Sequence, residues 1–296
     1  MPDRGAPPGH CSAARAEETK RWQCGSKCFE IAYGHPLIMG ILNITPDSFS
    51  DGASFDSDAK ALAQAERLLS EGADIIDVGG ESTRPGHQEV SAACELARIL
   101  PTVRELAGRR AVVSVDTRHA AVAAACLAAG AQIINDVSGF RDVAMAELAA
   151  TSCCGLVVMH WDAASNQRVP AWLLQRAREL EAIGVARERI CLDPGPGFDK
   201  GHADNLTILG QTTEIAGFGY PLMAAWSRKR FVAELCGESD PTTRDCASAQ
   251  VASAAVTGGA DVLRVHNVKL HVEMLHTREG LRASQTKDLF TTHTFE

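Results

Sequence analysis

The sequence predicts an α/β protein with a single folded domain, a (β/α)8 TIM barrel, and three observations support that prediction. From Leu37 onward, short apolar runs alternate with longer stretches rich in Ala and Leu, which is the pattern of parallel strands joined by helices. Eight such runs occur without a break in composition, in a chain of 296 residues that suits one barrel. The first run is not followed by the GxGxxG turn that is typical of dinucleotide-binding open sheets.

The elements follow in order along the chain. Residues 1–25 mix Pro, Gly and charge without periodicity and predict a mobile leader, after which CFEIAYGHP predicts a short N-terminal hairpin. We expect the barrel domain to span residues 26–285 and a tail to follow at 286–296. Between the strands, helical stretches such as AKALAQAERLLSEG end in Gly, which favours a helix C-cap. The predicted strands are 37–43, 75–80, 112–117, 133–136, 156–160, 190–195, 221–226 and 262–266.

Composition excludes several classes of protein. A formal net charge of -8 argues against a protein whose main task is to bind nucleic acid, because that needs a clustered cationic surface. No segment reaches the roughly 18 continuous apolar residues of a membrane span, and residues 1–22 lack an apolar signal core, so a cytoplasmic protein is expected. Four of the ten cysteines lie in apolar or helical stretches, which predicts reduced thiols: Cys126, Cys191, Cys236 and Cys246. Cys24 and Cys28 lack the second ligand pair of a zinc site.

Polar residues gather where the predicted strands end. One polar residue in such a place is more often a helix N-cap than a catalytic group. In a barrel, however, the carboxyl ends of all strands share one rim, and active sites lie on that face. The sequence therefore predicts an active site built from some of these rim residues: Asn43, Asp77, Asp116, Asn135, Asp136, His160, Asp193, Ser227 and His266.

The segments at the strand ends also carry specific motifs. They are NITPDSFSDG (43–52), GGESTRPG (79–86), SVDT (114–117), INDVSG (134–139), MH (159–160), DPGPGF (193–198), SRK (227–229) and RVH (264–266). In this order, from about Leu37 to Val268, the motifs resemble those of the dihydropteroate synthase family. The resemblance implies a transferase of folate biosynthesis, in which 6-hydroxymethyl-7,8-dihydropterin pyrophosphate and p-aminobenzoate give 7,8-dihydropteroate and pyrophosphate. It further implies Mg2+ as the cofactor, sulfonamides as inhibitors, and a homodimer.

The pterin pocket can be argued from chemistry as well. A pterin ring presents N–H donors and one carbonyl acceptor, so its pocket needs buried acceptors and a cationic or amide donor. Carboxylates, an amide and one lysine at the strand ends meet that need. The resemblance implies the same assignment and adds two apolar walls, so the expected pterin-binding residues are Asp116, Asn135, Asp193, Lys229, Met159 and Phe198.

The remaining parts of the site follow from the last strand and from the resemblance. Arg264 and His266 end the eighth strand, and Asn267 is placed to cap the next helix, so the positive end of that helix would face pyrophosphate. By resemblance, Asn43 ligates Mg2+ and Arg84 also contacts the pyrophosphate. The family's p-aminobenzoate positions correspond here to Phe49, Thr83, Pro85 and Arg230. The implied catalytic residues are Asp47, Lys229 and Asp116, with Asp47 stabilising the pterin cation left when pyrophosphate departs.

Several features depart from the family pattern. Arg230 stands where Ser is usual, Asn267 where Asp is usual, and Trp226 where a small or β-branched residue is usual, while the stretch 160–193 is shorter than in the family. Ser227 is expected to be a helix N-cap, which would place three cations in a first helical turn.

These departures leave an alternative open: a catalytically weak paralogue that binds a pterin or a partner protein without synthase activity. A pterin-binding methyltransferase that serves a corrinoid protein would share INDV-like features. It would not require TPDSFSDG or SRK.

Overall fold

A computed structural model of the chain describes residues 19–45, 54–81, 89–161 and 168–288. Its main feature is a sheet of eight parallel strands in the order β8-β7-β6-β5-β4-β3-β10-β9. A parallel bridge between Leu192 and Leu222 joins the two ends of this sheet and closes the barrel. The strands are β3 (Leu37–Asn43), β4 (Ile75–Gly79), β5 (Val113–Asp116), β6 (Ile133–Asp136), β7 (Gly155–Met159), β8 (Ile190–Asp193), β9 (Met223–Ala224) and β10 (Val262–Val265).

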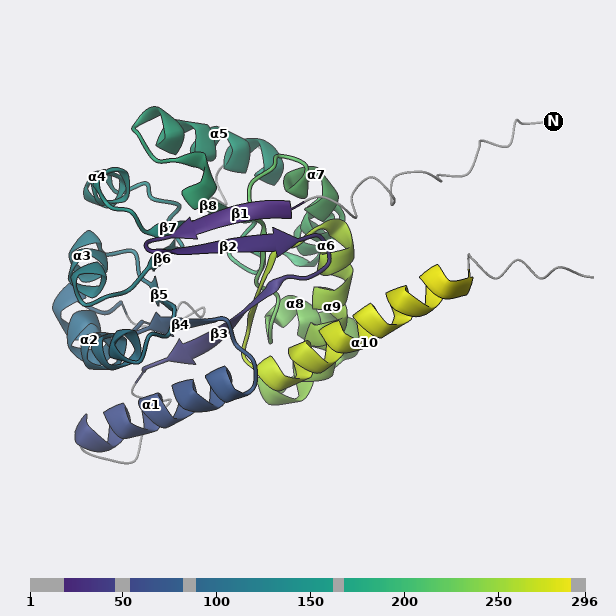
Figure 1. Cartoon of the computed structure of the whole chain (residues 1–296), viewed down its shortest axis with the longest axis horizontal. Helices are drawn as coiled ribbons and strands as arrows, with labels where there is room; N and C mark the ends of the chain where they lie inside the picture. Colours follow the sequence, from purple (N-terminus) through teal and green to yellow (C-terminus); the bar gives the residue numbers. More distant parts are fainter. Residues whose placement is uncertain (1–18, 46–53, 82–88, 162–167, 289–296) are drawn as a thin grey trace, which may run out of the picture.

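Helices surround the barrel, as the alternating pattern predicts (Figure 1). The apolar faces of the helices pack against apolar residues on the outer face of the barrel strands. These contacts form two clusters of buried side chains. The helices are α1 (Ser54–Ser70), α2 (Ala92–Gly108), α3 (Ala120–Ala128), α4 (Val143–Thr151), α5 (Val169–Ala182), α6 (His202–Gly210), α7 (Thr212–Ala216), α8 (Arg230–Cys236), α9 (Asp245–Gly258) and α10 (Val268–Asp288), with short 3-10 turns at Arg187–Arg189 and Pro241–Arg244.

An antiparallel hairpin of β1 (Thr19–Cys24) and β2 (Lys27–Ala32) lies across the amino-terminal end of the barrel (Figure 1). Trp22 is fully buried and its indole N–H donates to the Arg189 carbonyl at the start of β8, 3.1 Å away. Gly155 at the start of β7 allows this close approach, since a Cβ there would lie 2.6 Å from the Cys24 sulfur. The hairpin thus seals the apolar interior of the barrel at the end opposite the predicted rim.

The hairpin corrects one boundary of the sequence analysis. The leader was expected to extend to residue 25, but β1 begins at Thr19. Residues 19–24 alternate exposed and buried side chains, TKRWQC, and this period of two was missed because it is short and rich in polar residues. The eight predicted barrel strands are confirmed, with β9 reduced to two residues. Among the helices of the described residues, none has the length and apolar character needed to cross a membrane.

Candidate active site

Strand register brings the predicted site residues into one row at the rim. Asn43 ends β3 and pairs with Gly79 of β4, Gly79 pairs with Asp116 of β5, and Asp116 pairs with Asn135 of β6. On the far side of the row, Met159 of β7 pairs with Asp193 of β8. Sheet pairing alone therefore places residues from six successive strand ends side by side, with no contribution from the loops.

Arg264 of β10 crosses the barrel mouth and joins two of these strands. Its Nε donates to Asp77 Oδ2 and its Nη2 to Asp116 Oδ2, each at 2.6 Å. Asn135 Nδ2 donates to the same Asp77 oxygen at 3.1 Å. Asp77 is fully buried and lies one strand away from Asp116. Burial raises the pKa of Asp116 to about 7, with the nearby Arg264 opposing the shift and the Asp77 carboxylate adding to it.

Asp193 and Lys229 form the other half of the pocket. Asp193 is buried, and its Oδ1 accepts the Gly195 N–H at 2.8 Å. Lys229 donates to the Pro196 carbonyl, and its ammonium lies 4.4 Å from the centre of the Phe198 ring. Burial lowers the pKa of Lys229 to about 7 against the attraction of Asp193, and burial likewise raises the pKa of Asp193 against the attraction of Lys229.

The turn after β8 depends on a glycine and on a lysine that the sequence analysis did not identify. Gly195 has φ +63, and a Cβ there would lie 2.1 Å from the His160 carbonyl oxygen. Lys200 Nζ donates to the carbonyls of His160, Gly195 and Phe198 at 2.9 to 3.1 Å. Lys200 thus ties the β7 and β8 ends together and holds the backbone beneath the predicted pterin walls. No sequence pattern distinguished it from an ordinary solvated lysine.

Ser227 has a different role from the one predicted. Helix α8 begins at Arg230 with Lys229 as its N-cap, so Ser227 lies outside the helix. Its hydroxyl lies 2.9 Å from His266 Nδ1 and accepts the His266 backbone N–H at 3.2 Å. The prediction failed because Arg228 takes φ +58, which turns the chain before the helix starts. Ser227 therefore positions the imidazole at the end of β10.

One departure from the family pattern, Asn267, lies in a polar cluster behind the rim with Arg228 and Asp245. Arg228 makes a two-pronged ion pair with Asp245, with nitrogen–oxygen distances of 2.7 and 2.8 Å. Asn267 Nδ2 donates to the same carboxylate at 2.9 Å, and Asn267 Oδ1 accepts the Leu270 N–H at 3.1 Å, as expected for the cap of α10. An amide suits this position because an Asp here would face Asp245 with a second negative charge.

The other two substituted positions differ in exposure. Trp226 is buried in the core between barrel and helices, with its ring centre 5.2 Å from that of Phe231. The large side chain is thus accommodated by packing in the core. The Arg230 side chain is 91% exposed and pairs with Glu234 one turn along α8, at 3.1 Å. The predicted residues Asp47, Phe49, Thr83, Arg84 and Pro85 lie outside the described residues.

A cavity of about 280 Å³ opens beside Asp116. Its acidic lining is partly offset by Arg118, and it adjoins the row of rim residues through Asp116 and Thr117. Residues that the sequence analysis did not assign to the site contribute most of the wall. The lining residues are Glu81, Glu89, Glu95, Asp116, Thr117, Arg118, Val137 and Trp161.

Comparison with known proteins agrees with this geometry. Residues 39–266 match the family described as "Pterin binding enzyme". A dihydropteroate synthase of Neisseria meningitidis serogroup C is 42% identical over 276 residues, covering 88% of this chain and 97% of that protein. The solved structure of Xanthomonas albilineans dihydropteroate synthase with 4-aminobenzoic acid superposes with a TM-score of 0.85 at 36% identity, covering 90% of this chain and 99% of the other.

A second solved structure, Burkholderia cenocepacia dihydropteroate synthase complexed with 7,8-dihydropteroate, gives a TM-score of 0.81 at 37% identity. It covers 90% of this chain and 98% of that one. The fold and the matched residues define a pterin-binding barrel enzyme. Within that class, the chain belongs to the dihydropteroate synthase family.

Proposed function

We propose that this chain condenses 6-hydroxymethyl-7,8-dihydropterin pyrophosphate with p-aminobenzoate, giving 7,8-dihydropteroate and pyrophosphate. The observation that carries the proposal is the arrangement at the rim, where Asp116, Asn135, Asp193 and Lys229 lie on strands or strand ends around one barrel mouth. Relatives with the same fold hold 4-aminobenzoic acid and 7,8-dihydropteroate. These are the aryl substrate and the product of the proposed reaction.

The pterin would lie between the two halves of the pocket. Asp193 and Asn135 offer acceptors and an amide to the amino-pyrimidinone edge, and Lys229 offers a donor to its carbonyl. Met159 and Phe198 would flank the ring, with Lys200 holding the Phe198 backbone. Because burial brings the pKa of Lys229 to about 7, the lysine can exist in both protonation states near neutral pH.

The pyrophosphate would lie toward β3 and β10. Arg264 already uses Nε and Nη2 on Asp77 and Asp116, so its Nη1 is the group that we assign to a phosphate oxygen. His266, oriented by Ser227, and the amino-terminal end of α10 face the same region. Breaking the methylene C–O bond releases pyrophosphate and leaves a pterin methylene cation. The aryl amine nitrogen of p-aminobenzoate then forms the C–N bond and releases one proton to solvent. The buried carboxylates at the rim favour that cation electrostatically.

The residues present also suit Mg2+. Gly79 leaves between Asn43 and Asp116 a space that a Cβ would fill, 3.5 Å from Asn43 Oδ1 and 3.8 Å from Asp116 Oδ2. Amide and carboxylate oxygens are ligands that a hard divalent cation prefers. When bound at Asn43, Mg2+ would neutralise charge on the leaving pyrophosphate. We assign this role to Asn43, with Arg84 as a further pyrophosphate ligand.

The direct test is an assay of p-aminobenzoate incorporation by the purified chain, together with complementation of a strain that lacks the synthase. Turnover and growth would support the proposal. A chain that binds the pterin tightly but incorporates no p-aminobenzoate would instead be the catalytically weak paralogue. Homodimer formation is a further proposal, and light scattering of the purified chain measures it.

Magnesium dependence gives a second expected result. Turnover should stop in excess chelator and return when Mg2+ is added back, because the leaving pyrophosphate is highly charged and needs a cation to neutralise it. Asn43→Ala should raise the Mg2+ concentration needed for half-maximal turnover. Calorimetry should show pyrophosphate binding without any pterin, and Mg2+ should strengthen that binding less in the Asn43→Ala variant than in the wild type. Full activity in chelator would contradict the assignment.

Arg230 leads to an expected result with sulfonamides. We propose that its guanidinium turns from Glu234 to the carboxylate of p-aminobenzoate, beside a slot that Phe49, Thr83 and Pro85 complete. Sulfonamides lack that carboxylate and are bulkier, so the wild type should be less sulfonamide-sensitive than Arg230→Ser by a few-fold. The measurement is the ratio of the inhibitor constant to the p-aminobenzoate KM.

The matched control is Glu234→Gln, which frees the guanidinium without removing it and should keep the ratio at or above that of the wild type. An equal or higher ratio in Arg230→Ser would mean that Arg230 stays in solvent, where the exposed side chain now lies.

A further inference from the structure

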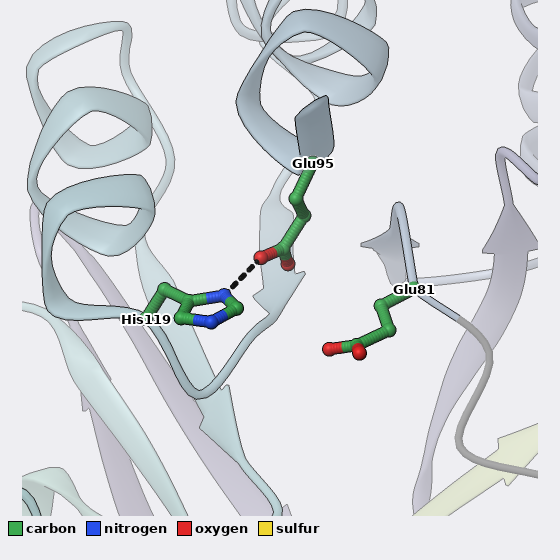
Figure 2. A group of neighbouring side chains, drawn as sticks. All are labelled: Glu81, Glu95 and His119. Carbon is green, nitrogen blue, oxygen red and sulfur yellow. Dashed lines mark hydrogen bonds and ion pairs between the residues drawn. The ribbon is translucent and has the colours of Figure 1, made fainter. Parts of the chain in front are cut away.

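Three side chains outside the proposed substrate pocket converge on one point (Figure 2). Glu81 follows the end of β4, Glu95 lies in the first turn of α2, and His119 precedes α3. One ligand atom from each lies within 4.8 Å of the other two. Figure 2 shows both carboxylates and the imidazole ring directed toward the space between them. Glu81 and Glu95 belong to the β4–α2 unit and His119 to the next unit, β5–α3, so the pairing of β4 with β5 brings the three residues together.

Glu95 supplies an independent reason to expect a ligand at this point. Its side chain is 1% exposed, and Oε2 lies 2.7 Å from His119 Nδ1. The second oxygen, Oε1, is buried and receives no hydrogen bond from any described residue. A buried carboxylate oxygen without a partner is destabilising, because it has lost its hydration without gaining a hydrogen bond. The His119 contact therefore leaves half of this carboxylate unsatisfied.

Glu81 accepts the Val90 backbone N–H at 3.1 Å and also pairs with Arg118, but the Arg118 contacts are long. Arg118 reaches both Glu81 oxygens only at 3.3 Å, while it makes a shorter contact with the exposed Glu89. Charge-assisted hydrogen bonds of good geometry are about 2.7–2.9 Å long. The adjoining cavity is lined by Glu81, Glu89, Glu95 and Asp116, with Arg118 as the cation in the lining. This local excess of carboxylates favours a bound cation.

We propose that Glu81, Glu95 and His119 bind a divalent transition-metal ion, with Zn2+ held more tightly than Mn2+. One imidazole nitrogen with two carboxylate oxygens is a ligand set that suits zinc and its neighbours, whereas Mg2+ prefers oxygen ligands alone. Ligand atoms around zinc lie roughly 3.4 Å apart, given bonds of about 2.0–2.2 Å in a tetrahedron. The present spread of 4.8 Å would thus close by about 1 to 1.5 Å, which side-chain rotation can supply.

This site is separate from the Mg2+ position that we assign to Asn43, and it does not depend on the synthase activity. Its ion would join the end of β4, the start of α2 and the segment before α3, beside the cavity at Asp116. Binding to the folded chain alone should also raise the thermal unfolding midpoint in proportion to occupancy.

The experiment is calorimetric titration of the full, metal-free chain with Zn2+ and with Mn2+ under reducing conditions. We expect one Zn2+ site per chain. His119→Gln and Glu81→Gln should each weaken Zn2+ binding at least about tenfold, since even outer-shell changes cost that much in metal sites. Arg118→Gln should tighten it, because a competing cation is removed. Glu89→Gln is the matched control: it also removes one negative charge beside Arg118, and Zn2+ affinity should stay near that of the wild type.

A titration with Co2+ separates this site from adventitious binding by cysteines. Cobalt held by nitrogen and oxygen gives no thiolate-to-metal charge-transfer band, and Asn43→Ala should bind it normally. Circular dichroism checks that each variant is folded. In the wild type itself, Zn2+ should protect His119 from chemical modification, read by mass spectrometry. Equal Zn2+ affinity in the wild type and the folded ligand variants, a thiolate band, or an unprotected His119 would overturn the proposal.

Discussion

Replacing Arg264 by Ala should lower the free energy of unfolding by about 3–5 kcal/mol, the usual cost of removing one partner from a buried ion pair. Arg264 is the shared counter-ion of Asp77 and Asp116, and Asp77 is fully buried. Without the guanidinium, the carboxylates of Asp77 and Asp116 would lie beside each other on the paired strands β4 and β5 without their shared counter-ion. Denaturant unfolding monitored by circular dichroism measures the change.

The matched control is Arg109→Ala. Arg109 also joins two carboxylates, those of Glu66 and Glu105, but all three side chains are about half exposed. Solvent screens that cluster, so its loss should leave the free energy of unfolding nearly unchanged. If Arg264→Ala and Arg109→Ala lowered the free energy of unfolding equally, burial of the Arg264 ion pairs would contribute nothing to stability.

The pH dependence of the Arg264→Ala variant has a definite sign. Burial already raises the pKa of Asp116 from 3.8 to about 7 with Arg264 present, and removing Arg264 raises this pKa further. The folded variant then binds a proton that the unfolded chain releases above about pH 4, so its stability falls as pH rises through this window. Relative to the wild type, whose Asp116 already binds this proton below about pH 7, the variant should therefore lose stability as pH rises above 7 and regain it as pH falls back to about 7. A stability difference independent of pH would contradict this account.

Replacing Asp193 by Asn should reduce pterin affinity at least about tenfold, because hydrogen bonds to a charged acceptor contribute roughly 1.5–3 kcal/mol. The substitution is close to isosteric, and the Asn oxygen can still accept the Gly195 N–H that Asp193 now binds at 2.8 Å. The turn should therefore keep its shape while the charge is lost. Lys229 loses its nearest attraction at the same time, so its lowered pKa should fall further. Calorimetry with the pterin pyrophosphate measures the affinity.

Glu188→Gln controls for the loss of one negative charge. Glu188 is exposed beside the start of β8, whereas Asp193 is buried at the end of the same strand. The pterin affinity of the Glu188→Gln variant should match that of the wild type. Unchanged affinity in Asp193→Asn would mean that Asp193 only shapes the turn and that the pterin lies elsewhere.

The chain sequence by itself determined the barrel and most of the rim. Apolar runs such as 37–43 and 133–136 became β3 and β6 with the predicted bounds, since buried parallel strands need continuous apolar residues whatever surrounds them. Asp116, Asn135 and Asp193 could be placed because the carboxyl end of every strand faces the same rim. The shorter alternation in 19–24 was too polar to be recognised as a strand.

Only the tertiary structure decided which charges meet. Arg264 and Asp77 are 187 residues apart in the chain, and nothing local indicates that the arginine pairs with the carboxylates of both Asp77 and Asp116. Ser227 reads locally as a helix cap, but the positive φ of Arg228 turns it toward His266. The contact between Glu95 and His119 likewise depends on tertiary structure, because the pairing of β4 with β5 brings α2 beside the segment before α3. The apolar pattern of a strand can be read from the sequence because it depends on whether each residue is buried. An ion pair depends on the distance between residues far apart in the chain, which only the whole fold determines.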